Sequence, residues 1–128
     1  MRLLLDTHAF IWAASDSPRL SDRARGLIED PDCDLVVSSV VATEIAIKSA
    51  RGRLELPDEP SVWVPTRILA FGARELPITV AHAMLGGALP RHHADPWDRL
   101  LIAQAILEQL AILTADPLFA RYDVETVW

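Results

Sequence analysis

The sequence predicts an α/β domain with a twisted, mostly parallel sheet of four or five strands flanked by helices. Short apolar runs alternate with longer segments of helical periodicity from one end of the chain to the other. No internal repeat, low-complexity segment or linker interrupts this alternation. A chain of 128 residues is long enough to bury one core. We therefore expect one domain over residues 1–128.

Five short runs have the character of strands, the last of them at an edge of the sheet. The runs are RLLLD at residues 2–6, CDLVVSS at 33–39, LPIT at 76–79, LAILTADP at 110–117 and VETVW at 124–128. Helical segments separate the first four runs, and such connections favour parallel strands. The carboxyl ends of parallel strands meet at one edge of the sheet, where open α/β sheets bind their ligands.

The segments between the runs are expected to be helical. They are THAFIWAA at 7–14, the stretch after Ser21 in 16–32, 40–54, the second half of 58–75, 80–93 and 95–110, with a further turn at 117–122. Ser21 is a suitable N-cap, and the helix after the second strand should end near Gly52. Pro65 is expected to break a long helix, and the Gly86-Gly87 pair to close the helix that contains it.

Composition excludes several classes of protein. The net charge of −6 does not give the basic surface common in nucleic-acid-binding proteins, although acids gathered around a cation repel less than their count implies. A lone Cys33 excludes internal disulfides and multi-cysteine zinc sites, and indicates a reducing, cytoplasmic setting. No apolar run reaches the ~20 residues that span a bilayer. Asp6 and His8 interrupt the apolar start, unlike a signal peptide.

Four acids are expected to gather at the carboxyl edge of the sheet. Asp6 and Asp116 end two strands, Glu44 lies early in the helix after the second strand, and Asp98 lies in a first helical turn. Two unpaired carboxylates ~4 Å apart repel by roughly 4 kcal/mol at an effective dielectric near 20. Mg²⁺ or Mn²⁺, which prefer oxygen ligands, would remove that repulsion. Such an ion activates water and steadies the leaving oxygen of a phosphodiester.

Each acid also has a structural interpretation. Asp6, Asp95 and Asp116 are placed as N-caps, the last two directly before a proline. An acid at Asp98 suits the helix dipole, and Glu44 can pair with Lys48 one turn later. Capping and metal binding are compatible, so these interpretations stand beside the metal site.

The residues resemble a known family. LLLDTHAFIW, VVSSVVATEIAIKSARGRLEL, LPI, LPRHHADPWDRLLIAQA and ILTADPLFARYDVETVW resemble, in this order, the PIN-domain family, and within it the VapC-like ribonuclease toxins of type II toxin-antitoxin modules. The resemblance covers nearly the whole chain. It implies a single PIN domain with an acidic Mg²⁺ or Mn²⁺ site. Thr43 departs from relatives that often carry Trp there, which we expect to alter packing.

The resemblance also assigns roles to residues. The family's acids fall on Asp6, Glu44, Asp98 and Asp116 as catalytic and metal-binding residues, and Thr114 matches the polar residue that supports the last acid. We expect Asp6 and Asp98 to bind the cation directly. Glu44 and Asp116 would bind it directly, bind it through water, or orient the attacking water.

The activity implied is metal-dependent endoribonuclease cleavage by a toxin that a small antitoxin neutralises, with a homodimer also implied. Trp12 and Trp63 are candidates for an apolar groove that holds an antitoxin helix, or for the core. Contacts to RNA phosphates are open to five basic residues, which otherwise form a solvated face: Lys48, Arg51, Arg53, Arg91 and Arg99.

Three further alternatives stay open. Of the adjacent His92 and His93, one would contact phosphate or pack near the helix entrance, and a zinc site is not expected. The same metal chemistry would also suit single-stranded or structured DNA. An inactive PIN-like binding module is the non-enzyme alternative, and the presence of all four acids argues against it.

Overall fold

The computed structural model describes residues 1–128 and contains one five-stranded sheet in the order β3-β2-β1-β4-β5. All neighbouring strands are parallel, so the predicted fold class is confirmed. The strands are β1 (Arg2–Leu5), β2 (Asp34–Ser38), β3 (Arg74–Leu76), β4 (Ala111–Leu113) and β5 (Thr126–Val127). Central β1 is buried from Leu3 to Leu5. Such continuous apolar strands are typical of parallel sheets covered on both faces.

The third strand lies earlier than predicted. The apolar run at residues 76–79 was expected to form it, whereas β3 ends at Leu76 and pairs Arg74 with Val36 of β2. Pro77 has no N–H to donate to a ladder, so the strand stops before it. The expected edge strand at the end of the chain is present as β5, on the opposite edge of the sheet.

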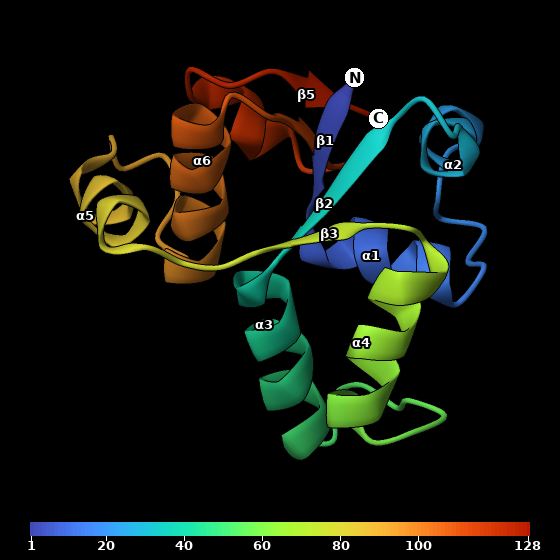
Figure 1. Cartoon of the computed structure of the whole chain (residues 1–128). Helices are drawn as coiled ribbons and strands as arrows, with labels where there is room; N and C mark the ends of the chain where they lie inside the picture. The colour runs from blue at the N-terminus through green and yellow to red at the C-terminus, as the bar shows by residue number, and fades with distance from the viewer.

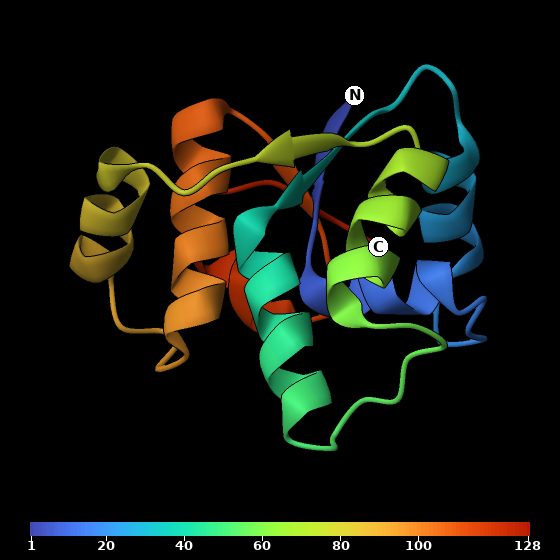
Figure 2. The same ribbon diagram turned by 60° about the horizontal axis from the view of Figure 1, so that its bottom comes forward.

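Helices cover the sheet in two groups (Figures 1 and 2). Figure 1 shows α6 on one side of the strands and α1, α2 and α4 on the other, with α5 outside α6. The helices are α1 (Thr7–Ala14), α2 (Asp22–Glu29), α3 (Ser39–Ala50), α4 (Pro60–Ala70), α5 (Val80–Ala88) and α6 (Pro96–Glu108), followed by the 3₁₀ helix η1 (Pro117–Arg121). None of them combines the length and apolar character that a membrane crossing requires.

Helix ends follow the local signals in part. Ser21 caps α2 through its side chain, and α3 ends just before Gly52, whose φ of +69° favours glycine. The expected break at Pro65 is wrong, because α4 continues through it; the side chain is exposed, so water can satisfy the carbonyl that loses its partner. The Gly86-Gly87 pair does not close α5 either. A Cβ on Gly86 would lie 3.2 Å from Leu100, so glycine lets α5 approach α6 closely.

The sheet places two polar segments side by side. Leu5 at the end of β1 pairs with Leu113 at the end of β4, and the Asp6 N–H donates to the Leu113 carbonyl at 3.1 Å. Directly beyond these strands come Asp6 and Thr114, both buried. The carboxyl edge of the sheet is therefore the edge at which the chain brings polar side chains together.

Candidate active site

Asp6 and Asp116 each cap a helix at this edge with one carboxylate oxygen. Oδ1 of Asp6 accepts from the N–H of Ala9 at 2.8 Å in the first turn of α1. Oδ1 of Asp116 accepts from the N–H of Leu118 at 2.9 Å in η1. The predicted capping roles of both acids are confirmed. In each residue the second oxygen takes no part in the cap and is available for another contact.

Glu44 reaches the same edge from α3. Its side chain is buried, with the residue 8% exposed, and Oε1 accepts a hydrogen bond of 2.6 Å from the Thr7 hydroxyl. Lys48, one turn along the helix, lies 4.0 Å from Oε2. Thr7 was not among the residues expected at the site; it directly follows Asp6 and turns its hydroxyl toward the glutamate. The contact fixes one carboxylate oxygen and leaves the other facing a single lysine.

Asp98 stands in the first turn of α6, where Asp95 caps the helix by accepting from the N–H of Trp97 at 2.9 Å. The cap expected of Asp95 is therefore confirmed, and Pro96 begins the helix as predicted. The Asp98 side chain is 24% exposed and extends toward the imidazole ring of His93, which comes from the loop before α6. The start of α6 thus supplies Asp95 as the helix cap and Asp98 as an acid at the carboxyl edge of the sheet.

All four acids line one pocket of about 240 Å³. Burial raises the pKa of Asp6 and of Glu44 above their usual values. Burial, followed by the nearby carboxylates Asp95 and Glu44, raises the pKa of Asp98 to about 7. Asp116 and Asp6 add to the same effect. A pocket in which carboxylates disfavour one another's charge is one that a divalent cation stabilises, so this donor set fits Mg²⁺ or Mn²⁺.

Thr114 connects the two acids that end strands. Its hydroxyl oxygen accepts from the N–H of Asp116 at 3.0 Å. A hydrogen bond between Thr114 and Asp6 lowers the pKa of Asp6 and partly offsets the effect of burial. The threonine therefore orients the backbone of one acid and favours the charged form of the other.

The five basic residues with a possible role in RNA contacts divide into two groups. Three of them line the pocket of the acids: Lys48, Arg51 and Arg53. Arg99 does not, and its guanidinium instead donates to the carbonyls of Gly86 at 3.0 Å and Leu89 at 2.6 Å, at the end of α5 and directly after it. Arg91 lines a different hollow, beside Arg99. The guanidinium of Arg99 is thus engaged with backbone carbonyls outside the pocket of the acids, and a contact between Arg99 and RNA stays a prediction.

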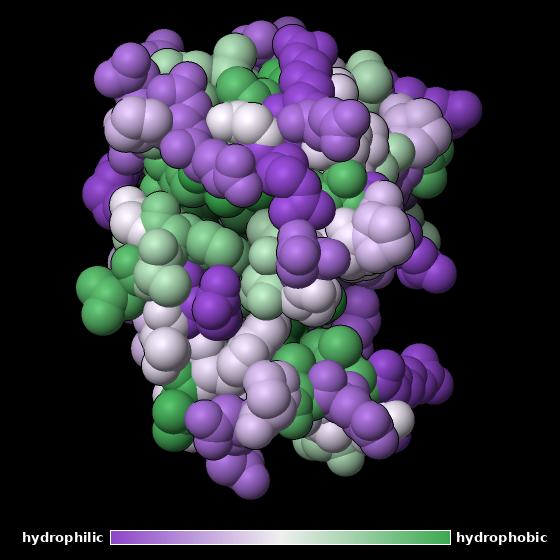
Figure 3. All heavy atoms as spheres, turned by 90° about the vertical axis from the view of Figure 1, so that its right-hand side faces the viewer, coloured by the Kyte–Doolittle hydropathy of each residue, from purple (hydrophilic) through white to green (hydrophobic).

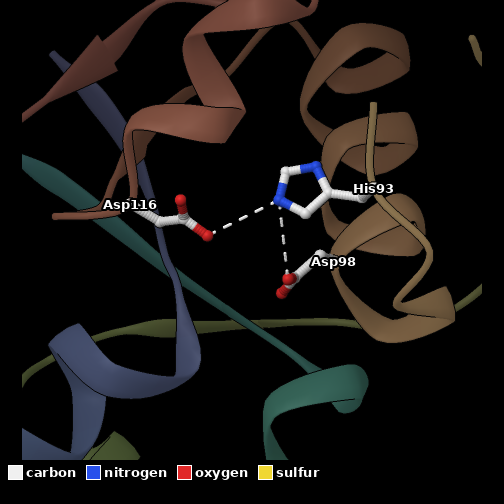
Figure 4. A group of neighbouring side chains, drawn as sticks. All are labelled: His93, Asp98 and Asp116. Carbon is white, nitrogen blue, oxygen red and sulfur yellow. Dashed lines mark hydrogen bonds and ion pairs between the residues drawn. The ribbon is translucent and has the colours of Figure 1, made fainter. Parts of the chain in front are cut away.

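His93 is the residue that the expected acidic set did not include. It is 7% exposed, and its Nε2 lies 3.7 Å from Oδ2 of Asp98 and 3.5 Å from Oδ2 of Asp116. Figure 4 shows the three side chains pointing toward one another from the loop before α6, from α6 and from the segment after β4. The adjacent His92 is exposed. The pair of histidines is visible in the sequence, but no spacing rule indicates which ring faces the acids.

Of the two alternatives for Trp12 and Trp63, a groove or the core, the structure favours packing within the chain. Trp63 is 8% exposed and meets Phe10 edge to face, with ring centroids 5.9 Å apart, so it belongs to the core. Trp12 is half-buried, and its ring centroid lies 5.4 Å from that of His8 and 5.8 Å from that of Trp128. Packing within the chain, the alternative to a groove, is thus the role of both residues.

Comparison with known proteins gives consistent results. A model of the PIN domain matches residues 3–125. Ribonuclease VapC22 of Mycobacterium tuberculosis is 33% identical over 115 residues, which cover 89% of this chain and 86% of that protein.

Two solved structures share the fold. The first is a chain from the crystal structure of VapBC2 from Rickettsia felis bound to a DNA fragment from its promoter. It has a TM-score of 0.74 at 15% identity, and the match covers 99% of this chain and 98% of that chain. One chain of a toxin-antitoxin complex from Klebsiella pneumoniae has a TM-score of 0.67 at 17% identity and covers 98% of this chain and 96% of its own. Because the family model spans nearly the whole sequence, this chain belongs to the PIN domain family.

Proposed function

We propose that this protein is a metal-dependent endoribonuclease that hydrolyses RNA phosphodiester bonds and serves as the toxin of a type II toxin-antitoxin system. The observation that carries the proposal is the convergence of four carboxylates on one pocket, with the pKa of Asp98 raised to about 7. The relative that is named a ribonuclease, similar over 89% of this chain, supports the choice of RNA.

The proposed roles follow the geometry. Asp6 and Asp98 hold the cation directly, and Glu44 and Asp116 hold it directly or orient the attacking water. A bound Mg²⁺ or Mn²⁺ supplies Lewis-acid stabilisation of the charge that develops on the phosphate. Thr7 keeps Glu44 in place by donating a 2.6 Å hydrogen bond to its carboxylate. Thr114 keeps Asp116 in place by accepting a 3.0 Å hydrogen bond from its backbone N–H.

The substrate would approach along the basic side of the pocket. Lys48, Arg51 and Arg53 stand at the end of α3 and the turn after it, and they line the same pocket as the acids. Cations beside a catalytic centre bind the phosphates that flank the reacting bond and fix its register. This local placement compensates for a net charge of −6, which would otherwise repel RNA at long range.

A small antitoxin is the proposed partner, as the toxin-antitoxin complex with the same fold supports. Two grooves offer it a surface, the first mainly apolar and the second lined by both apolar and charged residues. One, of about 480 Å³, lies between α3 and α4 and includes Ala42, Val64 and Ile68. The other, of about 500 Å³, lies among α1, α2 and α4, on the face where Figure 3 shows apolar atoms in a hollow between polar groups. A homodimer and a cytoplasmic location complete the proposal.

Cleavage assays on protein purified free of antitoxin test this function. We expect the protein to cut one or more of a panel of structured RNAs with Mg²⁺ or Mn²⁺, and to lose all activity when a chelator removes the cation. Single-stranded and structured DNA of the same sequences form the parallel arm. Cleavage of DNA alone would replace RNA as the substrate, and absence of any metal-dependent cleavage would favour an inactive binding module.

A further inference from the structure

His93 is held rigidly beside the acidic pocket. Its ring stacks on Tyr122 at a centroid distance of 5.6 Å and meets the edge of Phe119 at 5.2 Å. Its backbone N–H donates to the Tyr122 hydroxyl at 2.8 Å, and its carbonyl accepts from Arg99 at 3.4 Å. These contacts come from η1, from the residue after η1 and from α6. Together they fix the direction of the His93 ring.

The ring nitrogen Nε2 faces Asp98 and Asp116 at a spacing that suits a shared cation. At 3.7 Å and 3.5 Å, both separations exceed the usual N–H···O range of about 2.7 to 3.2 Å, and one N–H cannot serve two carboxylates. One ligand atom from each of the three residues lies within 4.8 Å of the other two. Around a cation with bonds of about 2.0 to 2.2 Å, neighbouring ligands lie roughly 3.0 to 3.6 Å apart.

We propose that His93 binds the cation through Nε2 together with Asp98 and Asp116, and so favours a transition ion such as Mn²⁺ over Mg²⁺. Mg²⁺ prefers an all-oxygen shell that retains several waters, whereas imidazole nitrogen is a better ligand for transition ions. The inference rests on the cation dependence of the proposed function and adds a nitrogen ligand to its carboxylates.

The surroundings of Nδ1, the second ring nitrogen of His93, determine how strongly we expect Nε2 to bind the cation. Nδ1 of His93 is buried and has no hydrogen-bond partner. Histidine ligands ordinarily donate this N–H to an acceptor, which makes the ring a stronger base and orients it. Here aromatic packing orients the ring and no acceptor strengthens it. Loss of His93 is therefore expected to weaken Mn²⁺ binding by only about tenfold, comparable to the smallest effects of removing a residue that supports a metal ligand.

Pulsed electron paramagnetic resonance of bound Mn²⁺ detects a coordinated imidazole directly. We expect nitrogen modulation in the wild-type protein and its loss in His93→Gln, with Mn²⁺ binding about tenfold weaker and Mg²⁺ binding changed less. The matched control is His92→Gln, which alters the neighbouring exposed ring and should keep the modulation. His8→Gln is the second control, because His8 lines the same pocket.

The outcomes separate this inference from the proposed function. Wild-type protein that binds Mn²⁺ and cleaves RNA without nitrogen modulation would overturn the role of His93 alone. Loss of modulation in His8→Gln or His92→Gln would overturn it too. Nitrogen modulation without cleavage of any RNA would support the ligand and reject the activity. The chain has four histidines, so if His93→Gln fails to fold, modulation that persists in variants of the other three still assigns His93.

Discussion

Replacement of Asp6 by asparagine is expected to abolish cleavage and leave the fold intact. The change removes the charge of a proposed direct ligand, so we expect activity to fall by at least about 1,000-fold, equivalent to about 4 kcal/mol of transition-state stabilisation. Asparagine caps helices about as well as aspartate, so the bond to the Ala9 N–H can be kept. Burial raises the pKa of Asp6, so loss of its charge should not destabilise the metal-free protein.

The measurement is the rate of RNA cleavage in Mg²⁺ or Mn²⁺, with circular dichroism to verify the fold. Asp30→Asn provides the same chemical change at an exposed acid outside the pocket, and should cleave at the wild-type rate. Full activity in Asp6→Asn would remove Asp6 from the catalytic set.

Replacement of Asp98 by asparagine is expected to stabilise the metal-free protein at neutral and alkaline pH. The pKa of Asp98 is raised from 3.8 to about 7 in the folded chain, mainly by burial. Between these values the folded state binds more protons than the unfolded state, so the wild-type protein loses stability as the pH rises through this window. Above pH 7 the folded wild-type protein carries the full cost of a charged Asp98. We therefore expect the free energy of unfolding of the variant to be higher by roughly 2 to 4 kcal/mol.

Chemical denaturation in chelator at pH 4 and at pH 8 checks this expectation. The advantage of Asp98→Asn should be small at pH 4 and large at pH 8, and Mn²⁺ should stabilise the wild-type protein more than the variant. Asp58→Asn, an exposed acid outside the pocket, is the control and should show neither effect. An advantage that does not vary with pH would mean that Asp98 is not the source of the charge cost.

Much of the site follows from local rules. Asp6 and Asp116 end parallel strands, and parallel strands present their carboxyl ends at one edge, so the proximity of the two acids is predictable from the sequence. Caps are equally local, since Ser21, Asp95 and Asp116 precede the helices that they cap. Such features depend on a few neighbouring residues and on the direction of the strands.

The remaining features depend on contacts between distant segments. Gly86 lies within α5 at a point where a Cβ would meet Leu100 of α6, and Arg99 donates to carbonyls at the end of α5 and after it. His93 rather than His92 faces the acids because Phe119 and Tyr122 hold its ring. No periodicity in the sequence encodes which partner a side chain meets across the fold, so these contacts could not be predicted from it.

Anomalous scattering from crystals soaked in Mn²⁺ tests most directly whether the four carboxylates form one cation site. We expect a peak inside the pocket of about 240 Å³, within bonding distance of Asp6 and Asp98, and no such peak in crystals of Asp6→Asn. A pocket that stays without a peak at saturating Mn²⁺, or a peak only at another face of the molecule, would contradict the metal site and the mechanism built on it.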